Sequence, residues 1–298
     1  MKNDRTLYLI DGSAYIYRAY HAIRSLTNSK GLPTNAAFGF TRMLMKLIED
    51  RSPEYVVMFF DAKGPTFRHE IYQDYKANRP PMPEDLSIQI PYIKEITHGF
   101  NIPVIEMKGF EADDLIGTFK WRAEKAGFFV VMVTGDKDFV QLVSDNAVIW
   151  DPMKEKTIDI NTVRDDLGVE PYQMIDVMAL SGDASDNIPG VPGIGPKTAL
   201  SLIKTFKTVE RLYESVHTIT KKKQQENLVQ HKKQAFLSKE LVKIHIDVPF
   251  PFNPENFKYQ APDNTRLSKL FKDLEFRQLQ QSFPKRSDLS NKNYHAVY

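Results

Sequence analysis

A chain of 298 residues, 42% of them hydrophobic, is long enough to bury a substantial core in one large domain or two. The absence of cysteine excludes disulfide stapling and fits a cytosolic protein, and no apolar stretch approaches the roughly 20 residues of a membrane span. The formal net charge of +2 decides little by itself, so the distribution of charge along the chain matters more.

Strand-like and helical stretches alternate over residues 1 to about 170. Short apolar runs rich in Val, Ile and Phe predict buried strands, and apolar positions at helical spacing predict amphipathic helices between them. Strands separated by helices imply a mostly parallel central sheet flanked by helices, so the expected fold class is α/β. The predicted strands are 7–11, 56–61, 102–105 and 130–136 with a small pair at 148–150 and 157–160, and the predicted helices are 13–22, 36–48, 84–100 and 112–126.

Three of these apolar runs end on an aspartate, namely Asp11, Asp61 and Asp136. Open α/β sheets carry their functional groups just beyond the carboxyl ends of the strands, so the three carboxylates are expected to converge on one edge of the sheet. Carboxylates that lie close together repel and raise each other's pKa unless a cation lies among them. The pattern therefore predicts a metal site.

Further acids occur at three places: at the start of the helix 112–126, just after the third long strand, and just before a Pro/Gly-rich turn. Singly, each could cap a helix, complement a helix dipole or occupy an ordinary turn, but together they favour the metal site. The complete candidate set is Asp11, Asp61, Glu111, Asp113, Asp114, Asp136, Asp138, Asp183 and Asp186.

The residue types indicate which metal would bind. The chain has no cysteine, and none of its 7 histidines forms a closely spaced pair near the acids, so zinc is disfavoured. All-oxygen ligation suits Mg²⁺ or Mn²⁺. Because one Mg²⁺ usually keeps several waters, so many acids favour two ions, the arrangement of enzymes that cleave phosphodiesters.

The stretch 63–83 interleaves aromatic and cationic side chains between two turn clusters. Arg68, Tyr75, Lys76 and Arg79 suit single-stranded nucleic acid, which is bound through base stacking and backbone charge. Because this stretch directly follows the second long strand, it is expected to overhang the metal edge and to be mobile without DNA. A surface loop without function is the alternative.

From about residue 171 to residue 244 the pattern turns helical and becomes cationic. Residues 204–243 hold ten Lys/Arg against four Glu, which suits a polyanion, because affinity for nucleic acid comes largely from neutralised phosphates. A solvated lysine-rich surface is the alternative. Proline-rich residues 249–254 break the pattern, a short helix near 267–274 follows, and residues 285–298 have the polar composition of a linker.

A Gly/Pro-rich segment, 188–199, opens a helix within this region. Such a turn presents free backbone N–H groups at the positive end of the helix dipole, which favours phosphate. Pro196 interrupts the Gly–Lys pair that a P-loop requires, so we interpret the segment as a helix–hairpin–helix-like element that binds the backbone of duplex DNA. A plain turn between two core helices is the alternative. The candidate contacts are Gly190, Val191, Gly193, Ile194, Gly195, Lys197 and Thr198.

Seven short segments occur in a characteristic order: 9–12, 60–61, 67–76, 111–114, 134–138, 182–187 and 190–195. Together they resemble the 5′-nuclease (flap endonuclease) family over residues 1 to about 284, and within it the 5′→3′ exonuclease domains of bacterial DNA polymerases I. The resemblance implies a PIN-like nuclease core at 1–170 with a helical gateway at about 62–90. It also implies a helical duplex-binding region at 171–284 that packs back on the core, and a linker at 285–298.

The resemblance further implies roles for individual residues. The implied ligands of a first ion are Asp11, Asp61, Glu111 and Asp113, and those of a second are Asp136, Asp138 and Asp186. Asp114 and Asp183 would lie near both ions or behind the direct ligands. The implied phosphate contacts are Lys76, Arg79 and Arg18, with Tyr75 available for stacking. The element 190–197 would bind the duplex together with a monovalent cation such as K⁺.

By this resemblance, the chain is a monomeric enzyme that hydrolyses 5′ ends or 5′ flaps of duplex DNA with two metal ions, for primer removal and repair at the bacterial nucleoid in the cytoplasm. It would be an excised domain with a polymerase domain in cis, or else a free-standing 5′-nuclease. A non-catalytic DNA-junction binder, a phosphatase with an aspartate nucleophile and a PIN-type RNA nuclease are rival interpretations. The complete set of motif acids argues against the junction binder.

Overall fold

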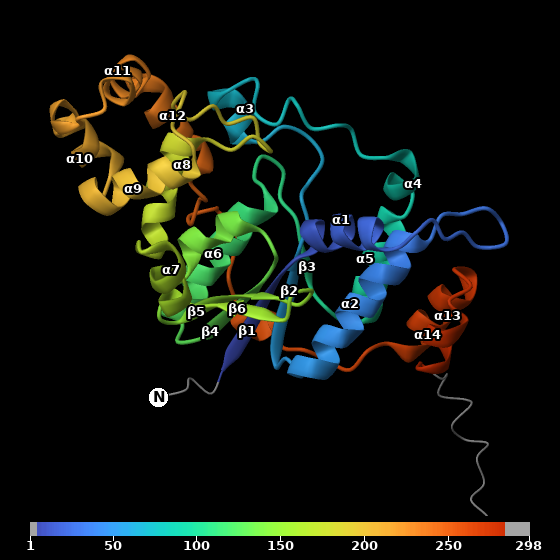
Figure 1. The fold of residues 1–298 in the computed structure, drawn as a ribbon. Helices are drawn as coiled ribbons and strands as arrows, with labels where there is room; N and C mark the ends of the chain where they lie inside the picture. The colour runs from blue at the N-terminus through green and yellow to red at the C-terminus, as the bar shows by residue number, and fades with distance from the viewer. Residues whose placement is uncertain (1–4, 284–298) are drawn as a thin grey trace, which may run out of the picture.

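The computed structural model describes residues 5–283, in which a six-stranded sheet is ordered β3-β2-β1-β4-β5-β6 (Figure 1). All neighbouring strands are parallel except β5 and β6, which are antiparallel. The strand order reverses between β1 and β4, and such a switch point opens a crevice at the carboxyl ends of the strands. The strands are β1 (Thr6–Asp11), β2 (Tyr55–Phe59), β3 (Val104–Ile105), β4 (Phe129–Val133), β5 (Ala147–Asp151) and β6 (Lys156–Ile158).

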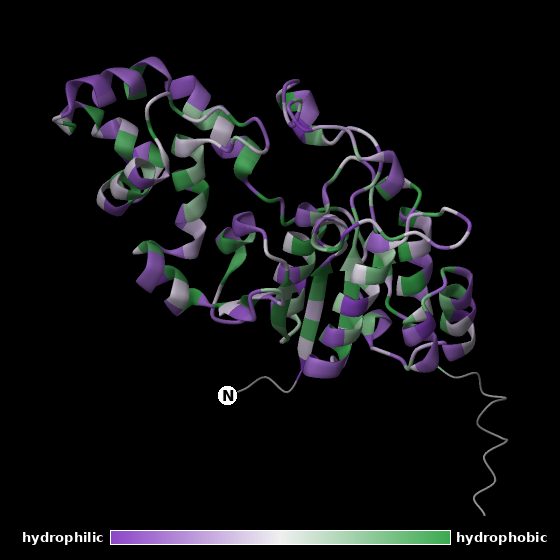
Figure 2. Ribbon diagram, turned by 45° about the vertical axis from the view of Figure 1, so that its right-hand side comes forward, coloured by the Kyte–Doolittle hydropathy of each residue, from purple (hydrophilic) through white to green (hydrophobic). Residues whose placement is uncertain are grey.

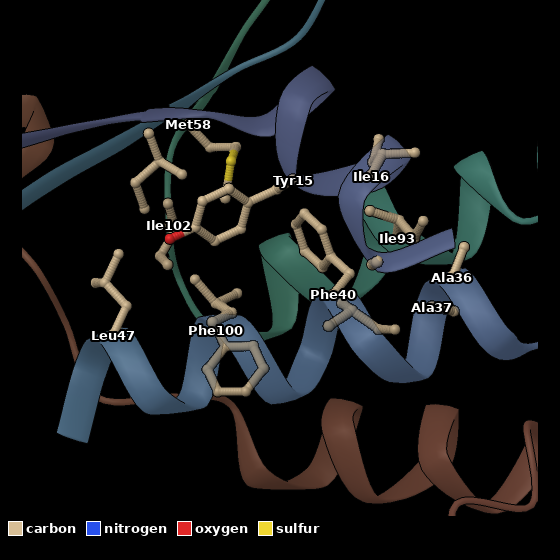
Figure 3. Packing of buried hydrophobic residues seen from close by; sticks show 14 of the residues in the cluster. Tyr15, Ile16, Ala36, Ala37, Phe40, Leu47, Met58, Ile93, Phe100 and Ile102 are labelled. Atoms are coloured by element: carbon tan, nitrogen blue, oxygen red, sulfur yellow. The ribbon is translucent and has the colours of Figure 1, made fainter. Parts of the chain in front are cut away.

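Helices cover both faces of the sheet, because successive strand side chains point to opposite faces and both sets are apolar. Ile10 and Met58 belong to a cluster with one group of helices, as Figure 3 shows for part of it, whereas Leu9 and Val57 belong to a cluster with another. The first face is covered by α1 (Gly12–Ala22), α2 (Asn35–Arg51), α5 (Ile90–Gly99), α13 (Asn264–Asp273) and α14 (Arg277–Gln281), and the second by α6 (Ala112–Lys125), η1 (Lys137–Leu142), α7 (Ile160–Leu167) and η4 (Pro254–Phe257). The predicted α/β class with a mostly parallel sheet is confirmed.

One predicted helix is wrong in its extent. The stretch 84–100 forms two helices, α4 (Glu84–Ser87) and α5, because Pro91 begins a new helix at its first turn. Gln89, between them, is fully buried and donates to the Asn35 Oδ1 atom at 3.0 Å. The break therefore packs against α2 instead of continuing one long helix.

The gateway expected at about 62–90 is less helical than the resemblance implied. Its only helices are the five-residue α3 (Phe67–Ile71) and the four-residue α4. Turns and the proline-rich residues 80–83 join them, and proline disfavours a continuous helix there. In Figure 1 this stretch arches over the carboxyl edge of the sheet, between the cationic helical region and α5.

The second half of the chain builds a helical lobe with a core of its own. Val177, Leu180, Ile203 and Leu212 are buried together there, and the polar faces of the lobe point outward (Figure 2). The lobe consists of η2 (Pro171–Gln173), α8 (Met174–Ser181), α9 (Pro196–Phe206), α10 (Val209–Glu214), η3 (Val216–Thr218), α11 (Lys222–Gln230) and α12 (Lys232–Val242).

The chain then returns to the sheet. Gln141 holds the return segment 241–248 from both sides, because its amide donates to the Val242 carbonyl at 2.9 Å and accepts from the Ile244 N–H at 3.0 Å. Beyond it, α13 and α14 pack against the helices of the first face. The predicted linker 285–298 lies outside the described residues, and no helix within 5–283 is both long and apolar enough to cross a membrane.

Candidate active site

Asp11 lies at the switch point of the sheet, where β1 and β4 end side by side. Its Oδ1 accepts from the Ala14 N–H at 2.9 Å and caps α1, and its Oδ2 accepts from the Thr134 hydroxyl at 2.9 Å. The residue is 4% exposed. Burial, together with the charges of Asp61 and Asp136, raises the pKa of Asp11 to about 7.

Asp61 and Asp113 complete a first group of acids at this edge. Asp61 follows β2, and its Oδ1 accepts from the Ala112 N–H at 2.8 Å at the start of α6. Burial and the charges of Asp11 and Asp136 raise the pKa of Asp113 well above its ordinary range. Carboxylates raise one another's pKa in this way only when they lie close together. The structure therefore gathers four of the predicted acids at one point.

A second group forms around η1. Asp136 caps this short helix by accepting from the Asp138 N–H at 2.9 Å. Burial and the charges of Asp136 and Asp183 raise the pKa of Asp138 to about 7, and its Oδ1 is buried without a hydrogen-bond partner among the described residues. Burial opposes the ionisation of Asp183, but hydrogen bonds from Ser185 and Lys137 hold its pKa below the ordinary value.

Two cations lie directly on the remaining acids. They belong to residues 72–79, here called the gateway segment, which contacts residues 182–188, here called the acid loop. The Lys76 Nζ lies 2.6 Å from Glu111 Oε1 and 3.6 Å from Asp186 Oδ2, and the Arg79 guanidinium also pairs with Asp186. Burial opposes a charge on Lys76, but Glu111 and Asp186 raise its pKa above the ordinary value. The charges predicted to act on a phosphate are therefore held at the acid cluster.

The resemblance implied that Tyr75 is available for base stacking, but the structure shows that it is not. The side chain is 3% exposed, and its hydroxyl lies 3.0 Å from both Glu111 Oε2 and Asp186 Oδ2. Apolar packing against Met178 and Ile188 covers the ring. Tyr75 therefore anchors the gateway segment, because a buried ring has no free face for a base.

Asp114 and Arg68 form a buried ion pair, which corrects both of their predicted roles. The guanidinium binds both carboxylate oxygens at 2.7 and 2.8 Å, and the side chains are almost inaccessible. Asp114 also accepts from the N–H groups of Glu111 and His245 at 3.1 and 2.9 Å, which leaves neither oxygen free for a metal. Arg68 in turn donates to the Leu241 carbonyl at 2.9 Å, so it holds the return segment and cannot reach DNA.

Arg18 is fixed beside the second group of acids. Its guanidinium donates to Asp151 Oδ1 at 2.8 Å and lies so close to Gly135 that a Cβ there would overlap it at 1.6 Å. Arg18 therefore lies against the turn that leads to Asp136, in contact with Asp151, in what we call the Arg18 clamp, and its contact with a phosphate stays a prediction. Asp151 is 4% exposed, and no sequence pattern predicted it at this position.

No group of three His, Asp or Glu side chains among residues 5–283 is arranged as the ligand shell of an ion. Lys76, Arg79 and Lys137 already neutralise part of the acid set. The donors nevertheless fit a hard divalent cation, because they are all carboxylate oxygens and the buried Asp138 Oδ1 has no partner within this part of the chain.

A cleft of about 800 Å³ adjoins Asp61 beneath the residues that follow the gateway segment. Tyr17 and Met82, both 41% exposed, supply apolar walls, and Lys94 and Arg79 supply charge. Such a mixture suits a nucleotide strand, because bases stack on apolar and aromatic groups while cations bind the phosphates. Tyr17 was missed in the sequence because it falls within an ordinary helical pattern.

The hairpin between α8 and α9 divides the predicted DNA contacts into two sets. Val191 and Ile194 are each 3% exposed and belong to the core of the helical lobe, so their side chains cannot contact DNA. Gly195, Lys197 and Thr198 lie at the start of α9, where Lys197 and Thr198 line a hollow of about 400 Å³. The apolar pair positions the turn, and the glycine, lysine and threonine remain at the surface.

Two family models match most of the chain. Residues 6–168 match the family described as 5′-3′ exonuclease, N-terminal resolvase-like domain, and residues 169–265 match 5′-3′ exonuclease, C-terminal SAM fold. DNA polymerase I of Bacillus caldotenax is 43% identical over 277 residues, which are 91% of this chain and 32% of that protein. The 5′-3′ exonuclease of Aquifex aeolicus is 40% identical over 275 residues, which are 92% of this chain and 94% of that protein.

Solved structures share the fold. The T5 5′-exonuclease with bound zinc has a TM-score of 0.68 at 22% identity and covers 94% of this chain and 99% of its own. The catalytic core of Rad2 in complex with a DNA substrate has a TM-score of 0.61 at 20% identity, covering 92% and 89%.

Proposed function

This chain belongs to the 5′-3′ exonuclease family, and from that premise we propose that it is a structure-specific nuclease acting at 5′ ends or 5′ flaps of duplex DNA. The observation that carries the proposal is the crowding of Asp11, Asp61, Asp113 and Asp136 at the switch point of the sheet. Burial and mutual repulsion raise the pKa values of Asp11 and Asp113, so without a cation the site disfavours full ionisation of these acids, and a bound cation would favour it.

The proposed cofactor is a pair of Mg²⁺ or Mn²⁺ ions. Asp11, Asp61, Glu111 and Asp113 would hold one ion, and Asp136, Asp138, Asp183 and Asp186 the other. When bound, such ions lower the pKa of water and stabilise the charge on a leaving 3′-oxygen. The T5 relative was crystallised with divalent metal ions, which supports metal dependence without identifying the ion used here.

The chain's own residues supply the remaining steps. Lys76 and Arg79 would pass from the acids to the oxygens of the scissile phosphate, where their charges balance the negative charge that grows during hydrolysis. Thr134 donates to Asp11 and so fixes the orientation of its carboxylate. The single-stranded 5′ end would enter the cleft beside Asp61, with a base against Tyr17.

The duplex would lie on the helical lobe. Gly193, Gly195, Lys197 and Thr198 would contact its phosphates at the start of α9, with a monovalent cation such as K⁺ at the same turn. The structure of the Rad2 core in complex with DNA supports a DNA-binding role for this fold. We propose the division into a nuclease core at 1–170 and a duplex-binding region at 171–284 on the same grounds, since the lobe has a separate core.

The cellular role is proposed from the relatives. The chain spans about a third of the DNA polymerase I relatives that it matches, and nearly all of the Aquifex aeolicus exonuclease. Relatives therefore support both a polymerase domain in cis and a free-standing enzyme. Primer removal and repair at the bacterial nucleoid, by a monomeric cytoplasmic protein, belong to the same proposal.

The test is cleavage of a 5′-labelled flap duplex with Mg²⁺, Mn²⁺ or EDTA. Asp113→Ala should abolish release of the flap, and Lys76→Ala should slow it by about 100-fold. Asn146→Ala is the matched control, because this exposed side chain makes no hydrogen bond within the described residues and lies at the opposite edge of the sheet. Tight flap binding without cleavage under any ion would instead identify a junction-binding protein.

A further inference from the structure

Two asparagines join the gateway segment to the acid loop. The Asn78 side-chain amide donates to the Ala184 carbonyl at 2.7 Å, and the Asn187 amide donates in the opposite direction, to the Asp74 carbonyl at 2.6 Å. Each segment thus supplies one amide donor and one backbone acceptor. Neither amide is hydrogen-bonded to a carboxylate of the acid cluster, and neither has a role in the proposed chemistry.

These bonds lie on either side of Lys76, and Arg79 directly follows Asn78. Between the asparagine contacts, the Lys76 N–H donates to the Asp186 carbonyl at 2.9 Å, and just beyond Asn78 the Arg79 Nε donates to the Ser185 carbonyl at 3.2 Å. Lys76 has a φ of 56°, in the left-handed region that side chains rarely adopt. Such a conformation persists only where the surroundings hold it, so the docking of the gateway segment must be what maintains it.

The apolar anchor alone does not fix this placement. Tyr75 lies in a buried cluster with Ile188 and Leu241, which holds the segment down onto the lobe. Apolar contact is non-directional, and among the described residues the Tyr75 hydroxyl bonds only to Glu111 and Asp186, which are proposed metal ligands. The asparagine amides are directional, and they hold the gateway segment on either side of Lys76 and immediately before Arg79.

We propose that Asn78 and Asn187 are positioning residues that fix the gateway segment on the acid loop in the placement that brings Lys76 and Arg79 over the acids. The inference rests on the proposed nuclease function, in which these cations act on the scissile phosphate. The acid loop continues directly into the hairpin that would grip the duplex. Through the acid loop, the asparagines therefore connect the binding of the duplex at the hairpin to the position of Lys76 and Arg79.

The test uses a nitroxide label at Ala77→Cys, which is specific because the chain has no other cysteine. Ala77 is exposed within the gateway segment, so the label reports its motion without filling a packed site. The test variant is Asn78→Ala with Asn187→Gly. Glycine is chosen because Asn187 has a φ of 56°, and alanine would add backbone strain to the loss of the amide. Asn146→Ala again provides the control.

We expect the labelled double variant to show a more mobile electron paramagnetic resonance line shape than the parent, without DNA or metal. Its single-turnover rate constant should fall by about tenfold or more, while its dissociation constant for the flap duplex changes less than about threefold. An unchanged line shape, or a mobile segment with an unchanged rate constant, would overturn the proposal. If the parent chain fails to cleave at all, the nuclease proposal falls, and the line shape still decides whether the asparagines hold the segment.

Discussion

The buried pair of Arg68 and Asp114 allows a decisive substitution, Asp114→Asn. The asparagine keeps the shape of the side chain but removes the charge that faces a guanidinium 2% exposed. It also loses one acceptor oxygen of the two that now bind the N–H groups of Glu111 and His245. The variant therefore leaves a buried cation without its main partner and one backbone donor without an acceptor.

Removing one partner of a buried ion pair costs about 3–5 kcal/mol. The value here should lie near 3 kcal/mol, since Glu111 Oε2 remains 3.4 Å from Arg68 and the Leu241 and Lys243 carbonyls still accept from the guanidinium. For a domain of this size, that loss lowers Tm by roughly 6–12 °C.

Urea unfolding and thermal melts of the metal-free protein measure this loss directly. The matched control is Asp166→Asn, because Asp166 pairs with Lys156 at 3.4 Å between exposed side chains, and its change should stay within about 0.5 kcal/mol. A metal ligand would behave in the opposite way, since neutralising it relieves repulsion and stabilises the metal-free protein. A loss below about 1 kcal/mol for Asp114→Asn would refute the structural role.

Three further predictions rest on individual contacts. The pKa of Asp11 rises from 3.8 to about 7 on folding, so between these pH values the folded state binds more protons than the unfolded state. The free energy of unfolding of the metal-free protein should therefore fall as pH increases through this range. In urea titrations, Asp11→Asn should make the free energy of unfolding less dependent on pH. Gly190→Ala should cost about 3 kcal/mol, because its Cβ would lie 2.3 Å from the Gly182 N at a φ of 60°, whereas Gly195→Ala, with nothing within 4 Å, should change stability by about 0.5 kcal/mol or less. In Gly135→Ala the methyl group displaces the Arg18 guanidinium, so adding Arg18→Ala should lower Tm no further, and an additive loss would contradict the clamp.

The sheet and its carboxyl-edge acids were predictable because both follow from local pattern. Buried parallel strands are continuous apolar runs, and Asp11, Asp61 and Asp136 follow such runs directly. The small strand pair at β5 and β6 was also predicted, although the extent of α5 was not, because Pro91 can either break a helix or begin one.

The side-chain roles that the sequence misassigned depend on long-range contacts. Arg68, Tyr75 and Asp114 have the chemistry of a DNA and metal site, yet each finds a partner dozens of residues away and becomes buried. Val191 and Ile194 were named as contacts because they lie in the hairpin motif; their apolar side chains belong to the core, and contact through their backbone stays a prediction. Nothing in the local sequence distinguishes an exposed arginine from one that pairs 46 residues away.

The return segment also determines when the fold around the acid cluster becomes complete during synthesis. The Asp114 carboxylate, beside the site acid Asp113, accepts from the His245 N–H, and α13 and α14 cover the face formed by the first hundred residues. A nascent chain that ends before residue 245 lacks these partners, although its strands and all the site acids have already been made. Translation therefore makes every site acid well before the residues that pack around them, so the proposed cleavage activity should appear only late in synthesis.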